Sequence, residues 1–460
     1  MAKNRLTLFI FIALVAGVAV GYFYNISVIH PYNQQITGAD RQVKNLNIQI
    51  ATTKDTTSAS YKLLQTQRAA QLKIKKGVET IREGKLELFT ALSTIFLKLI
   101  KMIVAPLVLS TLIVGVAKAG NINAVGRIGG KTLLWFISAS LMSLLLGMLL
   151  VNEFGPGRTM QLPLPDTHTV TDVAKSGFSL PDFIGHIFPE SLIGSMANNQ
   201  ILQIVVFALF FGTATAAIGE KGKVIIKAMD AIAHVILKIT SYVMQIAPFA
   251  VFGAIAVVIA KQGLGILSTY AIFIGEFYIS LIMLWLFIVF AGFVVLKGRA
   301  FKLVNGIKDA MLIAFSTSTS EAAYPRILME LERFGCSNKI VSFVLPLGYS
   351  FNLDGSMMYM TFASLFLAQC YHVPLTLQQQ FSMLLTLMLT SKGVAGVPRA
   401  ALVVVAGTIA IYNIPEAGLA LLLAIDPLLD MGRSATNVLG NAMATAVVSK
   451  WEGELAAPNE

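Results

Sequence analysis

The chain has 460 residues, of which 56% are hydrophobic and only 13% are charged, and its formal net charge is +11. Soluble domains carry about 25% charged residues, so the composition excludes an ordinary soluble protein and indicates a membrane protein. The positive charge does not indicate nucleic-acid binding, because much of it lies in short segments between apolar stretches, as in cytoplasmic loops. The two cysteines, Cys336 and Cys370, provide neither a disulfide framework nor metal-ligand spacing.

The N-terminal apolar stretch follows two basic residues, Lys3 and Arg5. It is long and lacks a small-residue cleavage site, so we expect residues 1–29 to form a retained first transmembrane helix with a cytoplasmic N-terminus. Residues 30–85 are polar and contain no run of about 20 apolar residues. We expect them to be an extramembrane insertion, either a helical hairpin or a mobile loop.

The middle of the chain contains ordinary apolar stretches separated by basic loops. Helices are predicted over residues 86–117, 131–151, 224–260 and 265–297, with a helical region interrupted by Pro and Gly before residue 218. Alternation of the loops across the membrane places the lysine clusters on the cytoplasmic side. Glu276 lies inside one of these helices, and we expect it to be either a proton site or a partner of a neighbouring helix.

In the last third of the chain, small polar residues and glycine interrupt the apolar stretches. The interruptions fall at Ser316–Ser320, Asn352–Gly355 and Ser391–Pro398. Non-helical backbone at membrane depth is tolerated only where it is buried in protein or lines a cavity. Repeated interruptions of this kind therefore indicate the binding site of a transporter.

The final helix carries a polar stripe. Its members lie at offsets of 0, 4, 7, 11 and 15 residues: Asp426, Asp430, Arg433, Asn437 and Asn441. At about 100° per residue they share one face within roughly 80°, and charges inside a membrane helix usually face a bundle interior or a cavity. A structural ion pair between Arg433 and an aspartate would also place charges here. Because two amides extend the stripe and a guanidinium matches a carboxylate, we predict that Arg433 binds an anion.

The interruptions themselves offer ligands. The run Ser316–Ser320 is either a polar turn or the tip of a re-entrant hairpin whose hydroxyls and free N–H groups hold a carboxylate. Asn352 and Asp354, together with carbonyls of an unwound stretch, provide hard oxygen ligands that suit an alkali cation or a proton.

Four motifs in this order resemble the dicarboxylate/amino acid:cation symporter family, also called the glutamate transporter family. They are the serine-rich tip ending at Pro325, Asn352–Gly355, Ala395–Pro398, and Asp430–Arg433 followed by Asn437. The resemblance runs from Phe96 to Lys450 and leaves out residues 30–85. It implies an all-α membrane protein of the bacterial inner membrane, a homotrimer whose subunits each have eight transmembrane helices and two re-entrant helical hairpins.

The resemblance also implies a fixed scaffold domain and an elevator-type transport domain. The scaffold would contain residues 1–29, 86–117 and 181–260, and the transport domain residues 131–151 and 265–450. Within the transport domain, the hairpins are expected at about 303–336 and 376–413, helix seven at about 338–371 and helix eight at about 416–450. Residues 451–460 would form a cytoplasmic tail.

By this resemblance Arg433 binds a side-chain carboxylate of the substrate and Asp430 binds its amino group. The expected substrate-binding residues are Ser318, Thr319, Ser320, Ser356, Val397, Asp430, Arg433, Ser434 and Asn437. The expected ligands of coupling cations, several of them through backbone carbonyls, are Gly348, Ser350, Asn352, Asp354, Ser391, Lys392, Val394, Asn437 and Asn441.

The motif Asp430–Arg433 predicts a symporter for glutamate or aspartate, because the family's C4-dicarboxylate carriers lack that aspartate; such a carrier is the alternative. Asn441 replaces an aspartate that ligates sodium in sodium-driven members, while Phe136 and Ala139 replace a Tyr and a Thr of another sodium site. These departures favour protons, with or without sodium, as the coupling ions. We expect no other cofactor, and no enzymatic activity, because no His or Lys near Ser320 forms an obvious nucleophile–base pair. An anion channel is a further alternative.

Overall fold

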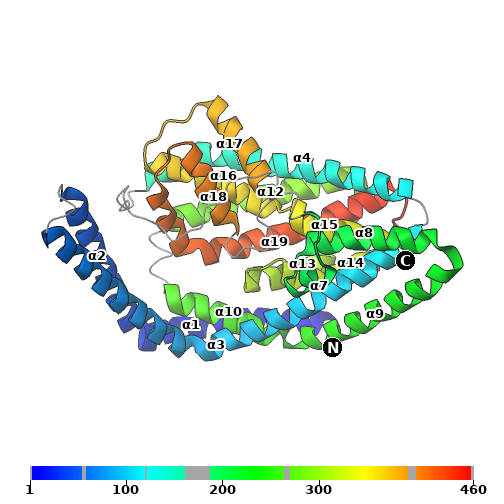
Figure 1. Ribbon diagram of the computed structural model, residues 1–460, viewed down its shortest axis with the longest axis horizontal. Coiled ribbons are helices and arrows are strands. Elements are labelled where there is room, and N and C mark those ends of the chain that lie inside the picture. The colour runs from blue at the N-terminus through cyan, green and yellow to red at the C-terminus, as the bar shows by residue number, and fades with distance from the viewer. Residues whose placement is uncertain are drawn as a thin grey trace.

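The computed structural model describes residues 3–53, 59–119, 122–160, 187–263, 270–391 and 400–456. These residues are almost entirely helical, and the β-pairing among them is limited to one bridge between Cys336 and Leu455. Most of the helices run along the long axis of the molecule as a bundle (Figure 1).

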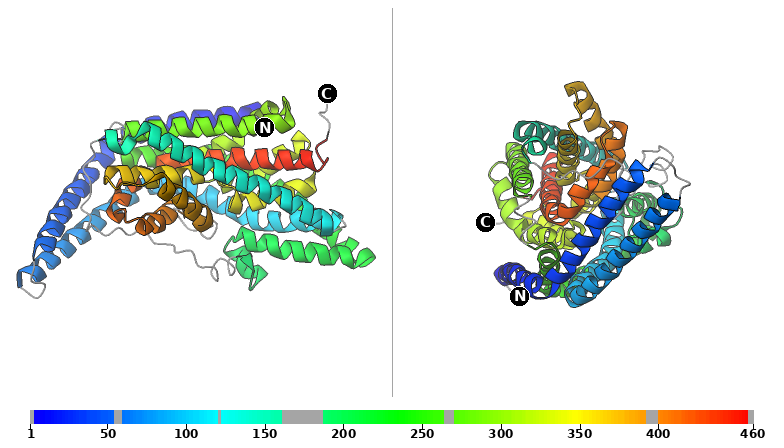
Figure 2. Two further views of the ribbon diagram at one scale, coloured as in Figure 1. Left: turned by 90° about the horizontal axis from the view of Figure 1, so that it is seen from above. Right: turned by 90° about the vertical axis from the view of Figure 1, so that its left-hand side faces the viewer.

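The N-terminal helices leave the bundle as a hairpin. Helix α1 (Lys3–Tyr24) continues through a π-helical turn (Asn25–Ile29) into α2 (His30–Thr52). Helix α3 (Ala59–Ala119) returns as one unbroken helix of 61 residues. The outer part of this hairpin projects from the bundle in Figure 1 and in the left view of Figure 2. The helix predicted over 86–117 is therefore only the inner part of α3.

The root of the hairpin is fastened to one neighbouring helix, α10 (Ala247–Gln262). The side-chain amide of Asn25 donates to the carbonyl of Ala260 at 2.6 Å, and Lys261 Nζ pairs with Glu83 at 2.5 Å. Arg82 donates to Asn33 Oδ1 at 3.0 Å, which joins α2 to α3 at the same level. The hairpin is thus held at its base by one buried, one half-buried and one exposed polar contact.

The middle helices follow in chain order: α4 (Ile122–Phe154), α5 (Pro156–Thr159), α7 (Leu192–Ala197), α8 (Ile201–Ala217), α9 (Gly222–Val243), α10 and α12 (Ala271–Leu296). The single helix predicted over 224–260 is wrong. It is divided into α9 and α10 by a 3-10 turn at Met244–Ile246. Pro248 lies in the first turn of α10, where its missing N–H costs no hydrogen bond, so proline favours a new helix start here.

The last third consists of paired shorter helices and one long one: α13 (Arg299–Thr317), α14 (Tyr324–Phe334), α15 (Asn338–Phe351), α16 (Asp354–Cys370), α17 (Leu377–Thr390), α18 (Ala400–Ile411) and α19 (Leu419–Trp451). Two of the sequence interruptions separate these helices. Ser318 ends α13 in the left-handed region with φ of 52°, and Asn352 and Leu353 leave helical geometry between α15 and α16. The third interruption, Ser391–Pro398, lies outside the described residues except for Ser391.

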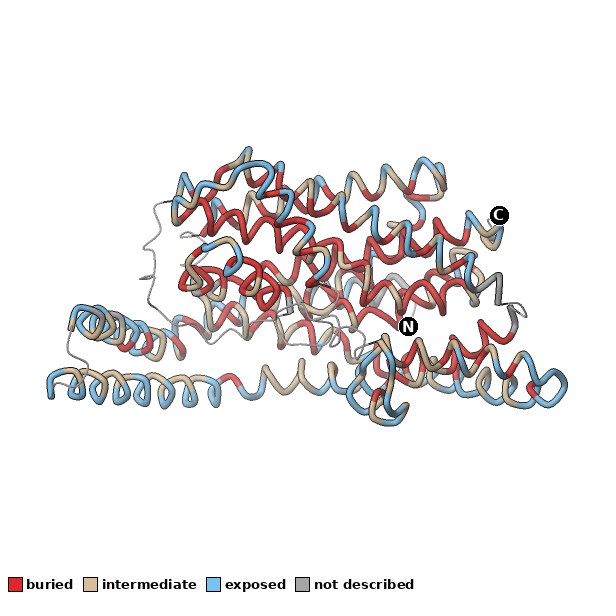
Figure 3. Tube along the Cα trace, turned by 45° about the horizontal axis from the view of Figure 1, so that its top comes forward, coloured by how far each residue is buried: buried red, intermediate tan, exposed pale blue. Residues whose placement is uncertain are grey.

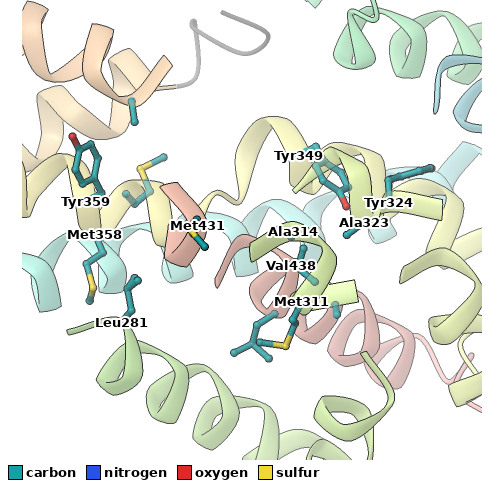
Figure 4. Close-up of a cluster of buried hydrophobic side chains, with 14 of the residues drawn as sticks. Leu281, Met311, Ala314, Ala323, Tyr324, Tyr349, Met358, Tyr359, Met431 and Val438 are labelled. Carbon is teal, nitrogen blue, oxygen red and sulfur yellow. The ribbon is translucent and has the colours of Figure 1, made fainter. Parts of the chain in front are cut away.

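Helices α16 and α19 form the centre of the bundle. Every residue from Met357 to Cys370 is buried, as is every residue from Met431 to Ser449 (Figure 3). Helix α12 packs against them on one side but exposes Leu286 and Phe290 on the other, as a helix facing lipid does. Leu281 of α12, Met358 of α16 and Met431 of α19 belong to the buried cluster in Figure 4.

Among the described residues, five helical stretches are long and apolar enough to cross a membrane. They are Leu8–Ile50, Ala59–Ala117, Gly126–Thr159, Gly219–Gln262 and Ala271–Leu296. The fold is therefore that of an all-α protein with several membrane-length helices. The expected count of eight spans with two re-entrant hairpins stays a prediction.

Candidate functional site

The charged stripe of α19 lies inside the protein. Arg433 is 2% exposed, and its Nη2 atom contacts Asp426 Oδ1 at 3.0 Å and Asp430 Oδ1 at 2.8 Å. The guanidinium also lies over the ring of Tyr359 from α16, 4.0 Å from the ring centroid. The Asp430 side chain is 37% exposed, whereas that of Asp426 is 5% exposed. Of the two aspartates, Asp430 is the one that a solute can reach.

The ion pair considered from the sequence is therefore present, but it uses only one nitrogen of Arg433. The Nε and Nη1 atoms are buried and have no hydrogen-bond partner among the described residues. An unsatisfied buried donor is costly, more so when it is charged. Nε and Nη1 donate from different edges of the guanidinium, so each of them can give a single charge-assisted hydrogen bond to an anion. The geometry consequently leaves Arg433 able to accept an anion beside Asp430.

Aromatic side chains that the sequence did not single out hold this region. Tyr278 of α12 donates to the carbonyl of Leu428 at 2.6 Å, and Trp285 donates to Thr436 Oγ1 at 2.7 Å. Both bonds fix α19 against α12. An aromatic residue in an apolar helix looks the same in sequence whether it faces lipid, core or site, so Tyr359, Tyr278 and Trp285 gave no signal.

A second polar cluster lies where α15 and α16 separate. Asn352 Nδ2 donates to Asp354 Oδ2 at 3.1 Å and to Asn441 Oδ1 at 3.2 Å, and all three residues are fully buried. From α4, Ser143 donates to the other oxygen of Asp354 at 3.4 Å. Asn352 Oδ1 has no partner in the part of the chain that the structure describes. Amide and carboxylate oxygens with one negative charge suit an alkali cation or a proton.

Transition-metal chemistry finds no support in this cluster. No group of three or more His, Cys, Asp and Glu side chains lies close enough to hold a metal ion within the described ranges. Asp354 is the single carboxylate of the cluster, and the other ligand candidates are neutral oxygens. A site of this composition favours the binding of an ion with a single positive charge, such as an alkali cation or a proton.

Two glycines make room for the second cluster. A Cβ atom at Gly440 would lie 1.9 Å from Asp354 Oδ2, and one at Gly348 would lie 2.3 Å from Asn441 Oδ1. Only glycine allows the backbone to approach these polar side chains so closely. The backbone at Gly348 and at Gly440 thus lies directly against the side chains of the cluster.

Asn437 connects the two clusters by holding the start of α16. Its Oδ1 accepts from the backbone N–H of Gly355 at 2.9 Å and of Ser356 at 3.4 Å, while its Nδ2 donates to Ser356 Oγ at 3.2 Å. These bonds satisfy N–H groups that the first turn of a helix leaves unpaired. The structure therefore gives Asn437 a positioning role, and its expected contact with a substrate stays a prediction, as does that of Ser434.

The serine-rich tip between α13 and α14 lies close to α15. Ser320 is buried, and its carbonyl accepts from the hydroxyl of Tyr349 at 3.2 Å. Tyr349 packs beside Tyr324, with ring centroids 5.4 Å apart (Figure 4). Ser318 and Thr319 are half-buried. The tip is thus joined to α15, which ends at Phe351 just before Asn352.

Several expected site residues have no described placement. Lys392, Val394 and Val397 lie outside the described residues. Ser391 is buried at the end of α17, where its hydroxyl donates to the carbonyl of Met388 at 3.0 Å. Ser350 is buried near the end of α15.

Glu276 of α12 lies apart from both clusters in sequence. It is half-buried, and its Oε2 atom is buried without a hydrogen-bond partner among the described residues. Among the described residues, this oxygen therefore makes no hydrogen bond to a neighbouring helix. The proton-site hypothesis stays a prediction.

Comparison with known proteins gives a consistent assignment. The sequence profile of the Sodium:dicarboxylate symporter family matches residues 6–451. A C4-dicarboxylate transport protein of Geobacter sp. (strain M21) is 42% identical over 369 residues, which cover 78% of this chain and 83% of the relative. A proton/sodium-glutamate symport protein of Bacillus subtilis (strain 168) is 40% identical over 365 residues, covering 78% of this chain and 85% of the relative. Another of that name, from Bacillus caldotenax, is 39% identical over 366 residues, covering 78% and 87%.

Proposed function

Because the chain belongs to the Sodium:dicarboxylate symporter family, a family of transporters and not of enzymes, we propose that it takes up glutamate or aspartate together with protons, sodium ions or both. Family membership confirms the resemblance inferred from the motifs. The observation that carries the substrate proposal is the buried Arg433, with two N–H groups lacking partners among the described residues, next to the half-exposed Asp430.

Each group of an acidic amino acid has a counterpart in this arrangement. One carboxylate accepts from the Nη1 group of Arg433, and the ammonium group binds Asp430. The second carboxylate is assigned to the tip residues Ser318 to Ser320 and to Asn437. In this proposal Asp426 keeps the guanidinium oriented and does not touch the solute.

Charge balance supports both the substrate and the cotransport. Arg433 with Asp426 and Asp430 has one net negative charge in a buried environment. Glutamate adds one more negative charge, whereas succinate adds two. Uncompensated charge in a low-dielectric interior is strongly unfavourable, so cations must enter with either anion. Glutamate needs fewer compensating cations than succinate, because it adds one negative charge fewer. The cluster of Asn352, Asp354 and Asn441 is our proposed site for such a cation or proton.

A C4-dicarboxylate is the second candidate, favoured by the relative of that name from Geobacter. Competition distinguishes the two. Uptake of labelled glutamate into proteoliposomes is measured with an excess of unlabelled aspartate or succinate. We expect aspartate to suppress uptake strongly and succinate weakly; succinate competing as well as aspartate would support the second candidate. Counterflow by preloaded glutamate would reject a pure channel.

We also propose the family's architecture for this chain. Residues 1–29, 86–117 and 181–260 are assigned to a fixed scaffold in a homotrimer of the bacterial inner membrane, and residues 131–151 and 265–450 to a moving transport domain. The location of the two polar clusters supports this assignment. Their residues come from α15, α16 and α19 and, through Ser143, from α4, and all of these positions fall within the proposed transport domain.

A further inference from the structure

The outer part of α3 carries an unpaired face that the transport site does not use. Eight positions alternate at spacings of four and three residues, and all of them are exposed: Leu63, Gln67, Ala70, Ile74, Gly77, Ile81, Gly84 and Leu88. We call this set the outer seam. None of its members is charged, although ten charged residues lie between Lys62 and Glu87 on the other faces.

This spacing is the heptad repeat of a coiled coil, sustained over more than three heptads. Leu63, Ile74 and Ile81 are 58%, 54% and 53% exposed, which is high for large aliphatic side chains at regular positions. The neighbouring charged residues, such as Lys73 and Lys76, keep this segment out of the hydrocarbon. Lipid therefore does not cover the seam.

Helix α2 does not cover the seam either. It contacts another face of α3, where Lys75 pairs with Asp40 at 2.6 Å and Arg82 with Asn33 at 3.0 Å. Figure 3 shows exposed and intermediate residues along this projecting hairpin. The seam thus remains available beside the α2–α3 contact.

Glycine inside the seam favours a closely packed partner. A Cβ atom at Gly77 or Gly84 would meet nothing within 4 Å, so the fold of one copy does not require glycine there. Glycine in a helix interior is destabilising relative to alanine. Small residues that alternate with Ile74 and Ile81 let a second helix approach closely and accept those side chains as knobs.

We propose that the outer seam packs against the same seam in the other copies of this chain, which the proposed homotrimer allows when its three seams face the common axis. Helix α3 runs without a break into the membrane-length stretch, where Ile95 and Met102 continue the same seven-residue repeat and are 54% and 57% exposed. Copies of one membrane protein share one orientation and one height in the bilayer. Their α3 helices are therefore parallel and in register, which places Ile74 opposite Ile74 and Ile81 opposite Ile81. The pairing does not depend on which solute is transported.

Cysteine scanning in native membranes tests the pairing. The two native cysteines are buried, so the unmodified chain serves as the blank. With a mild oxidant, Ile74→Cys, Gly77→Cys and Ile81→Cys are expected to give a product of twice the chain mass. Their yields should exceed those of Lys76→Cys and Arg41→Cys, exposed positions off the seam, at least fivefold. Equal yields on and off the seam, no product at the seam, or a product with a different polypeptide would overturn the proposal.

A second variant tests the close approach. Gly77→Leu is expected to reduce the cross-linking of Ile81→Cys severalfold. Gly38→Leu in α2, which also has open space around its Cβ position, is the matched control and should leave the yield unchanged. Unchanged cross-linking in Gly77→Leu would overturn the proposed packing. Both substitutions fall where one copy has room, so the fold of the single chain is preserved.

Discussion

In the proposed site, Asp430 is the residue that would distinguish an amino acid from a dicarboxylate. Its carboxylate is half-exposed and lies 2.8 Å from Arg433. In Asp430→Asn the ammonium group of glutamate loses a charged partner, worth about 1.5–3 kcal/mol, so the inhibition constant of glutamate should rise about tenfold to a hundredfold. The constant of succinate should change much less or improve, because one negative charge is removed.

Inhibition of labelled substrate uptake in proteoliposomes measures both constants. Asp230→Asn in α9 is the control, because the Asp230 side chain is 40% exposed, about as much as that of Asp430, and pairs with His234 one helix turn away. An equal loss of affinity for glutamate and for succinate in Asp430→Asn would contradict the proposed binding of the ammonium group by Asp430.

Gly440 tests whether the second cluster depends on close backbone approach. Alanine there would put a Cβ atom 1.9 Å from Asp354 Oδ2, and overpacking of this kind costs about 1–3 kcal/mol. We expect a lower midpoint of thermal unfolding in detergent and a large loss of cation-coupled uptake. Gly275→Ala in α12 has open space at its Cβ position and should behave like the unmodified chain. Equal stability of the two variants would refute this role for Gly440.

Part of the site could be predicted from residues alone. Charged and amide side chains in apolar stretches are costly, so Asp354, Arg433 and Asn441 stand out in the sequence. Tyr359 and Ser143 do not stand out, because Tyr and Ser are ordinary in membrane helices and their contacts depend on which helices pack together. The binding roles assigned to all of these residues stay predictions.

At the scale of elements, the helix pair α13 and α14 contains a buried charge network that is separate from the candidate substrate site. Arg326 of α14 contacts Asp309 of α13 at 3.0 Å and Glu330 at 3.2 Å. Removing one partner of a buried pair leaves an uncompensated charge and costs about 3–5 kcal/mol. Arg326→Gln should therefore lower the unfolding midpoint markedly.

The matched control for this network is Arg333→Gln. Arg333 also contacts Glu330, at 2.9 Å, but its side chain is 58% exposed, so the loss should be within about 1 kcal/mol. Thermal unfolding in detergent compares the two variants. Similar midpoints would mean that the Arg326 network does not hold α13 against α14.

The elements themselves were predictable to different degrees. Polar and glycine interruptions correctly indicated where α15 ends and α16 begins, because they remove apolar periodicity. The division of 224–260 was missed, since a proline inside an apolar run shows only in the structure as a new helix start. The continuity of α3 was also missed. Its outer half is polar, so the apolar pattern that predicts a membrane helix begins only in its inner half.

At the scale of the whole molecule, the residue that follows α19 joins this helix to α4. Glu452, just after α19, pairs with Arg127 at 2.8 Å and with Lys131 at 2.7 Å. The hydrogen bond from Arg127, with the charges of both bases, lowers the pKa of Glu452 below its ordinary value of 4.5. The depressed pKa means that this contribution to stability is fully present above pH 4.5 and is lost as the pH falls through the lower folded value.

The variant Glu452→Gln should accordingly show a smaller loss of unfolding midpoint between pH 5 and lower pH than the unmodified chain, and a slightly lower midpoint at neutral pH. Thermal unfolding across a pH series gives both slopes. Glu220→Gln, whose carboxylate is 85% exposed, is the control and should leave the slope unchanged. Parallel slopes for Glu452→Gln and the unmodified chain would contradict the linkage.

We propose that this transporter couples the uptake of an acidic amino acid to a cation gradient. Its most direct test is uptake of labelled glutamate into proteoliposomes with proton and sodium gradients imposed separately and together. We expect accumulation above the external concentration with an inward proton gradient, alone or aided by sodium, and its collapse when an ionophore removes the gradient. Entry of glutamate that never exceeds equilibrium under any gradient, or no entry at all, would contradict the account.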